Sequence, residues 1–142
     1  MIKKVASFAK INLFLYVTGK RKDGYHNLYS LMTQIDLCDD LYIDFSPKEL
    51  SILCDHPDVP EDESNLAYKA AELFYQSLKT KAGEEKNGLA IKIIKRIPPG
   101  GGLGGGSSNA ASVLMALNTY YKTPFSKSEL MTLGLKLGAD VP

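Results

Sequence analysis

The sequence has only two cysteines, no long apolar run and almost no net charge, and each of these shortages excludes a class of protein. Cys38 and Cys54 lie apart and neither belongs to a CxxC pair, which predicts two reduced, partly buried thiols rather than a metal or disulfide framework. No stretch approaches the roughly 20 apolar residues of a membrane-spanning helix, and the first residues are not of the signal-peptide type. We therefore expect a cytoplasmic protein with no membrane partner.

The charges nearly cancel, with 17 basic against 16 acidic residues and a formal net charge of +1. Nucleic-acid-binding domains usually carry a basic face, so this balance predicts no nucleic-acid partner. The 142 residues are 44% hydrophobic and 23% charged, which is ordinary for one globular domain with a real core.

Hydrophobic patterns predict a sheet in the first part of the chain and helices later. Strands are expected at Ser7–Val17, Asn27–Leu37, Leu41–Phe45, Leu50–Cys54 and Leu89–Lys95. One helix should follow Ser64 or Asn65 and end at Gly83, a second should follow the glycine run, and a third should extend from a capping box at Ser126 to Leu137. The predicted fold class is α+β, a two-layer, mostly antiparallel sheet with helices on one face.

Six glycines in seven positions, Gly100–Gly106, lie between a predicted strand and a predicted helix. Glycine lets the backbone approach a ligand closely and point its N–H groups inward, and the helix start adds unpaired donors and the positive end of the dipole. Ser107 and Ser108 supply hydroxyls that can cap the helix, hold a phosphate oxygen or reach magnesium. The run therefore predicts an anion cradle. A flexible linker would need neither the preceding Ile97-Pro98-Pro99 nor the following helix.

Three better-known phosphate loops do not fit this segment. The dinucleotide fingerprint G-x-G-x-x-G matches formally, but that match carries little weight in so glycine-dense a run, and no strand is evident afterwards. The P-loop requires Gly-Lys-Ser/Thr at its end, where this chain has Gly106-Ser107-Ser108. The loop of protein kinases lies between strands, not before a helix.

The segment from Pro99 to Ser108 resembles the phosphate-binding motif of the GHMP kinases, which include galactokinase and homoserine, mevalonate and phosphomevalonate kinases. Three further segments, Ala9–Leu13, Asp23–Leu28 and Gly138–Pro142, are similar in order and sequence to the other motifs of one branch of that family. This branch phosphorylates the 2-hydroxyl of a cytidine diphosphate derivative of methylerythritol in the non-mevalonate route to isoprenoid precursors. The resemblance implies ATP and magnesium as cofactors and this small molecule as substrate.

The resemblance also implies roles for individual residues. Asp140 would be the general base and Lys10 the cation beside it; Tyr25, His26 and Asn12 would bind the substrate, with the aromatic ring stacking on the cytosine. Ser108 would reach magnesium. The nucleotide would be held by Asn65, Leu66, Pro98, Pro99, Gly100, Gly101, Gly102, Leu103, Gly104, Gly105, Gly106, Ser107 and Ser108.

The chain departs from the family pattern in two respects. Members have a second, carboxy-terminal domain of similar size, so residues 1–142 are expected to be a truncated amino-terminal ATP-binding domain that is inactive alone. Asn109 stands where many members carry Asp. The alternatives are another GHMP kinase, of the mevalonate or homoserine type, and a nucleotide- or RNA-binding module without catalysis. The Asp23-Gly24-Tyr25-His26 loop favours the cytidine substrate over other alcohols. The sequence indicates no oligomeric state.

Overall fold

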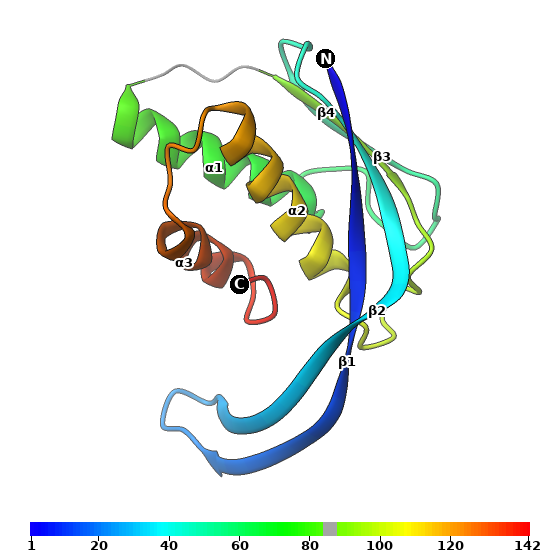
Figure 1. The fold of residues 1–142 in the computed structure, drawn as a ribbon, viewed down its shortest axis with the longest axis vertical. Coiled ribbons are helices and arrows are strands. Elements are labelled where there is room, and N and C mark those ends of the chain that lie inside the picture. Colours follow the sequence, from blue (N-terminus) through cyan, green and yellow to red (C-terminus); the bar gives the residue numbers. More distant parts are fainter. Residues whose placement is uncertain (84–87) are drawn as a thin grey trace.

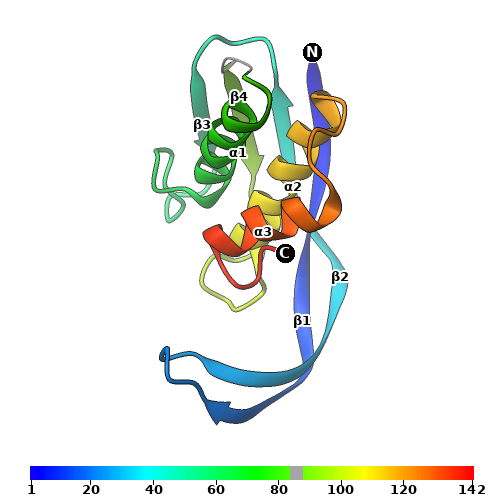
Figure 2. The same cartoon turned by 90° about the vertical axis from the view of Figure 1, so that its left-hand side faces the viewer.

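The computed structural model describes residues 1–83 and 88–142, and within them it has the expected α+β architecture (Figure 1). The strands are β1 (Ile2–Lys20), β2 (His26–Asp44), β3 (Leu50–Cys54) and β4 (Leu89–Ile94), and the helices are α1 (Leu66–Ala82), α2 (Gly105–Tyr120) and α3 (Lys127–Leu137). The sheet has the order β1-β2-β4-β3, with antiparallel pairs except between β3 and β4. The helices lie mainly on one face (Figure 2).

The break expected between strands at 27–37 and 41–45 is wrong, because residues 27–44 lie in a single strand, β2. The polar sequence between them suggests an interruption, yet Asp39 and Asp40 stay in the ladder opposite Ser7 and Ala6 of β1. Each carboxylate has a cationic partner, Lys95 for Asp39 and Arg96 for Asp40. Because these partners satisfy the buried charges, the strand can continue through them.

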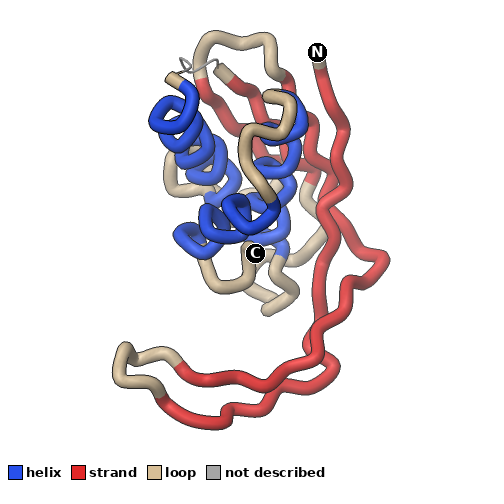
Figure 3. The backbone as a smooth tube through the Cα atoms, turned by 60° about the vertical axis from the view of Figure 1, so that its left-hand side comes forward, coloured by secondary structure: helices blue, strands red, loops and turns tan. Residues whose placement is uncertain are grey.

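Beyond the sheet, β1 and β2 continue as a two-stranded arm formed by residues 10–20 and 26–34. The pairing shifts register between Phe8 and Lys10, between Asn12 and Phe14, and between Val17 and Gly19, and such bulges bend a strand pair. The arm accordingly curves toward the side of the helices (Figure 3). Its large apolar side chains are exposed: Leu13, Phe14, Leu15, Tyr16, Val17, Leu28, Tyr29, Leu31 and Met32.

The core lies between the other part of the sheet and the helices. Leu41 and Ile43 of β2 and Ile91 of β4 are buried against Phe74 of α1 and residues of α2. Burying an aliphatic or aromatic side chain of this size stabilises a fold by about 1.5–3 kcal/mol. This layer fixes where β4 ends and where α1 and α2 begin.

The helix ends agree with the signals in the sequence. The Asn65 side chain accepts a hydrogen bond from the Ala67 N–H at the start of α1, and Gly83 takes a left-handed conformation at its end. Ser126 and Glu129 form the expected capping box of α3. Both cysteines are free and half-buried, as expected, and no described helix is long and apolar enough to cross a membrane.

Candidate active site

The glycine run forms a tight loop that opens directly into α2. The helix begins at Gly105, inside the run, and Gly100, Gly102 and Gly104 have φ values of 75°, 72° and 70°. Residues with side chains rarely adopt this left-handed region, which explains why glycine occupies these positions. Gly104 is the N-cap of α2 and provides no side-chain hydrogen bond. The first N–H groups of the helix are therefore left for a ligand.

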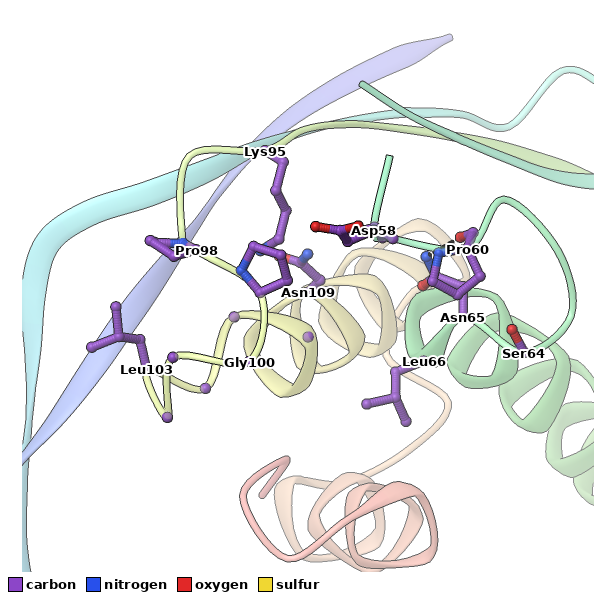
Figure 4. A pocket seen from close by; sticks show the side chains of 17 residues that line it. Asp58, Pro60, Ser64, Asn65, Leu66, Lys95, Pro98, Gly100, Leu103 and Asn109 are labelled. Carbon is purple, nitrogen blue, oxygen red and sulfur yellow. Dashed lines mark hydrogen bonds between the residues drawn. The ribbon is translucent and has the colours of Figure 1, made fainter. Parts of the chain in front are cut away.

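The loop borders a pocket of about 290 Å³ (Figure 4). Its walls include the glycine loop, the start of α1 at Asn65 and Leu66, and the segment Asp58–Pro60. The pocket thus brings together Asn65, Leu66 and residues 98–106, which were expected to hold the nucleotide and belong to separate parts of the chain. Ser107 and Ser108, expected there too, do not line it. The amino-terminal ends of α1 and α2 meet at this pocket.

Asn65 is held in place by two hydrogen bonds. Besides capping α1, its side-chain amide donates to the Pro60 carbonyl at 2.8 Å, and the residue is buried. Both ends of this side chain therefore serve the fold, and its position in the pocket wall is rigid. The capping role and a contact with a nucleotide are compatible.

Two further residues of this pocket were not among those expected to bind. Asn109 on α2 is only 3% exposed, and its Oδ1 has no hydrogen-bond partner among the described residues. Lys95, just after β4, lines the same pocket, and its side chain runs from the strand end toward Asn109 (Figure 4). Lys95 carries no sequence signal of its own, because a Lys at a strand end is common on ordinary surfaces, and in the sequence Asn109 is only a departure from the family pattern.

A second pocket, of about 490 Å³, lies on the other side of the glycine loop. Lys10, Asp140 and Ser108 line it, and Gly104 borders both pockets. The Lys10 Nζ lies 3.7 Å from Asp140 Oδ2, and the Lys10 backbone N–H donates to the Leu103 carbonyl at 2.9 Å. A cation and a carboxylate thus lie together directly beside the start of α2.

The hydroxyl of Ser108 is positioned by a residue of β1. Ser7 Oγ donates to Ser108 Oγ at 2.8 Å, and Ser7 is buried. Nothing in the sequence around Ser7 indicates this contact, because the two residues meet only when β1 packs against α2. The hydrogen bond restricts the orientation of Ser108, the one residue expected to reach a metal ion.

The expected substrate residues lie on the arm, away from the glycine loop. Lys10, Asn12 and His26 share one face of the arm, since Lys10 pairs with Gln34, Asn12 with Met32 and Lys20 with His26. Asn12 Oδ1 accepts a hydrogen bond from Ser30 Oγ. Tyr25 is 69% exposed in the turn at the tip and lines neither pocket. Asn12 and His26 therefore lie on the same face of the arm as Lys10.

The structure thus has a glycine loop that opens into a helix, beside a Lys–carboxylate pair, on an α+β sheet with its helices mainly on one face. Residues 65–142 match the family described as GHMP kinases N terminal domain, and the chain belongs to this family.

Relatives with assigned names are similar to nearly the whole chain. The 4-diphosphocytidyl-2-C-methyl-D-erythritol kinase of Clostridium botulinum (strain Eklund 17B) is 48% identical over 138 residues, which are 97% of this chain and 48% of the relative. The enzyme of the same name from Francisella tularensis subsp. novicida is 46% identical over 140 residues, 99% of this chain and 50% of the relative. The chain thus spans about half the length of the curated relatives it matches.

A solved structure shares the fold as well as the sequence. The crystal structure of a 4-(cytidine 5'-diphospho)-2C-methyl-D-erythritol kinase superposes with a TM-score of 0.76 at 40% identity, and the match covers 99% of this chain and 47% of that one. The similarity therefore includes the arm and the glycine loop together.

Proposed function

We propose that this chain is the ATP-binding domain of a cytoplasmic kinase that transfers the γ-phosphoryl group of ATP to the 2-hydroxyl of 4-diphosphocytidyl-2-C-methyl-D-erythritol, in the non-mevalonate route to isoprenoid precursors. The observation that carries the proposal is the position of the Lys10–Asp140 pair beside the glycine loop, with Gly104 bordering both pockets. The names of relatives at 46–48% identity support the choice of substrate.

The first pocket suits a nucleotide. Backbone N–H groups of the loop and of the first turn of α2 would bind the triphosphate, and the adenine would lie toward Asn65 and Leu66. The positive φ values at Gly100, Gly102 and Gly104 are consistent with a loop shaped around an anion. Asn109 offers a buried oxygen without a partner in the described structure, which a donor on the nucleotide can satisfy.

Magnesium fits this site as an ion bound mainly by the nucleotide. The described residues contain no group of three or more His, Cys, Asp or Glu side chains that could form a closed metal cage. The Ser108 hydroxyl lines the second pocket, and a single hydroxyl oxygen can join phosphate and water oxygens around Mg²⁺. When bound, the ion would offset charge on the triphosphate.

The second pocket suits the acceptor alcohol. Asp140 would accept the proton of the attacking hydroxyl, and general-base assistance of this kind typically contributes about 10²–10⁴ in rate. Lys10 would orient that carboxylate and stabilise the negative charge that develops on the transferred group. Since the Lys10 backbone N–H also donates to the loop, movement of the glycine loop would displace the Lys10 side chain.

The arm would supply one side of the substrate site. Asn12 and His26 lie on the face that carries Lys10, and an imidazole suits the polar edge of cytosine, while the Tyr25 ring can stack on a pyrimidine. We infer that residues beyond this chain, present in relatives about twice as long, complete the alcohol pocket. The isolated 142-residue chain would therefore bind nucleotide but not turn over.

The test is an ATP-coupled assay of the full-length protein that contains this chain, with each alcohol supplied in turn. We expect turnover with 4-diphosphocytidyl-2-C-methyl-D-erythritol at least about a hundredfold above that with mevalonate or homoserine, since a site that pairs with polar substrate groups discriminates by this much or more. Equal or greater turnover of mevalonate or homoserine would refute the substrate assignment. Absence of ATP consumption with every alcohol would refute the kinase assignment itself.

A further inference from the structure

A buried ion pair lies beneath the glycine loop. The Lys95 Nζ is 2.6 Å from Asp39 Oδ2, and the side chains are 4% and 0% exposed. Asp39 is on β2, at the position where the sequence suggested that the strand would be interrupted. Burying two charges is costly, and such a pair can be replaced by apolar residues without loss of stability in many proteins. Stability alone therefore does not explain why Asp39 and Lys95 are buried together in this fold.

The carboxylate of Asp39 does more than neutralise Lys95. Its Oδ1 accepts hydrogen bonds from the backbone N–H groups of Arg96, at 2.7 Å, and Ile97, at 2.8 Å. One side chain therefore holds three consecutive residues, and these lead directly into Pro98 and the glycine loop. Because Asp39 is itself paired with Ser7 in the sheet, it connects the rigid β layer to the entrance of the loop.

The cation held by Asp39 lies at the start of α2. A β-carbon added to Gly105, the first residue of that helix, would come within 2.7 Å of Lys95 Nζ. Lys95 also lines the pocket of the glycine loop, whereas Asp39 does not. An ammonium group next to the positive end of a helix is unfavourable unless an anion compensates it. Asp39 provides that anion, and so fixes where the positive charge lies relative to the pocket.

We propose that Asp39 is a positioning residue for nucleotide binding, an inference that rests on the proposed function. It acts through Lys95 and through the backbone of Arg96 and Ile97, and it sets both the shape of the glycine loop and the place of the buried cation. It touches neither the pocket nor the Lys10–Asp140 pair. Its removal should therefore change the affinity for ATP and leave the chemical step nearly intact.

The first variant is Asp39→Asn in the full-length protein, because asparagine can still accept from the two N–H groups but carries no charge. We expect KM for ATP to rise by about tenfold or more, with kcat and KM for the alcohol changed by less than about threefold; tenfold corresponds to about 1.4 kcal/mol of binding. The matched control is Asp40→Asn, which removes the neighbouring acid that pairs with Lys4 and Arg96. This control should bind ATP as the wild type does.

The second variant separates positioning from folding. Asp39→Asn leaves the Lys95 ammonium buried and unpaired, so it will lower the melting temperature. Combining it with Lys95→Met removes that charge, and we expect the melting temperature to recover while KM for ATP stays raised. Should the single variant not fold, the double variant is compared with Lys95→Met, and equal KM values for ATP in these two variants would overturn the inference.

Three results would overturn the inference. One is a folded Asp39→Asn variant whose KM for ATP equals that of the wild type. Another is a double variant in which the melting temperature and KM for ATP are restored together, since this would show a role in stability only. The third is a wild-type protein that neither turns over nor binds ATP in calorimetry. This result would overturn the proposed function and this inference with it, whereas the first two results would leave the proposed function intact.

Discussion

The ammonium group of Lys10 lies 3.7 Å from a carboxylate oxygen of Asp140, although one residue is on the first strand and the other follows the last helix. Lys10 also anchors the glycine loop through its backbone N–H and the Leu103 carbonyl. The long β1 strand thus carries both the cation of the pair and the support of the loop. Substitutions at Asp140 and at the glycine loop should therefore have different effects on the protein.

Asp140→Asn should lower kcat of the full-length protein by about 10²–10⁴, because the amide cannot accept the proton of the attacking hydroxyl. KM for ATP should change little, since Asp140 does not line the first pocket. The measurement is the coupled assay with saturating ATP. Asp36→Asn, an exposed acid of β2 that lines neither pocket, is the control and should retain full activity. A kcat within about threefold of wild type would exclude Asp140 as the base.

Gly104→Ala should destabilise the protein by about 1–2 kcal/mol, the usual cost of a side chain in the left-handed region. Gly104 has a φ of 70°, and an added β-carbon would also come within 3.1 Å of Lys10 Cγ. Urea unfolding measures the effect. Gly106→Ala is the matched control: its added carbon would meet only Leu66 Cδ1, at 3.6 Å, in a helix that favours alanine. If both variants had the same free energy of unfolding, the left-handed conformation of Gly104 would be contradicted.

The sequence predicts those features that are encoded locally. The caps at Asn65 and Ser126 and the strand at Leu50–Cys54 each follow from residues that are neighbours in the chain, and the structure has all of them. The helix expected after the glycine run is also present, but it begins inside the run, at Gly105. Turn chemistry and apolar periodicity act over a few residues, so no tertiary information is needed.

The pairs that organise the site could not be predicted in this way. Asp39 meets Lys95, and Ser7 meets Ser108, only because the strand register and the packing of α2 bring them together. The charge of Asp39 suggests a break in the strand until its partner is known. Asn109 stands out in the structure by a buried oxygen without a partner in the described part of the chain, which composition alone does not reveal.

Ser7→Ala should raise the magnesium concentration needed for half-maximal activity by about three- to tenfold, the equivalent of one hydrogen bond of 0.5–1.5 kcal/mol. The substitution frees the Ser108 hydroxyl from its fixed orientation. Activity measured against a magnesium series at saturating ATP tests this. Ser77→Ala removes a comparable hydroxyl hydrogen bond, to the Leu73 carbonyl in α1, and should leave the magnesium dependence unchanged. An unchanged dependence in Ser7→Ala would mean that Ser108 does not serve the metal.

The contact between α1 and α3 should make stability depend on pH in a defined range. A hydrogen bond from Lys81, at 2.6 Å, and one from the Ser126 backbone N–H hold the pKa of Glu129 at about 2, below its ordinary value of 4.5. A carboxyl whose pKa is lower in the folded state stabilises the fold above its unfolded pKa, and the contribution is lost as pH falls through the folded value.

The melting temperature of wild type should therefore exceed that of Glu129→Gln above pH 4.5, and the difference should disappear toward pH 2. Lys81→Met should show the same convergence with wild type, and a difference that stayed constant from pH 7 to pH 2 would show that the ionised pair contributes nothing.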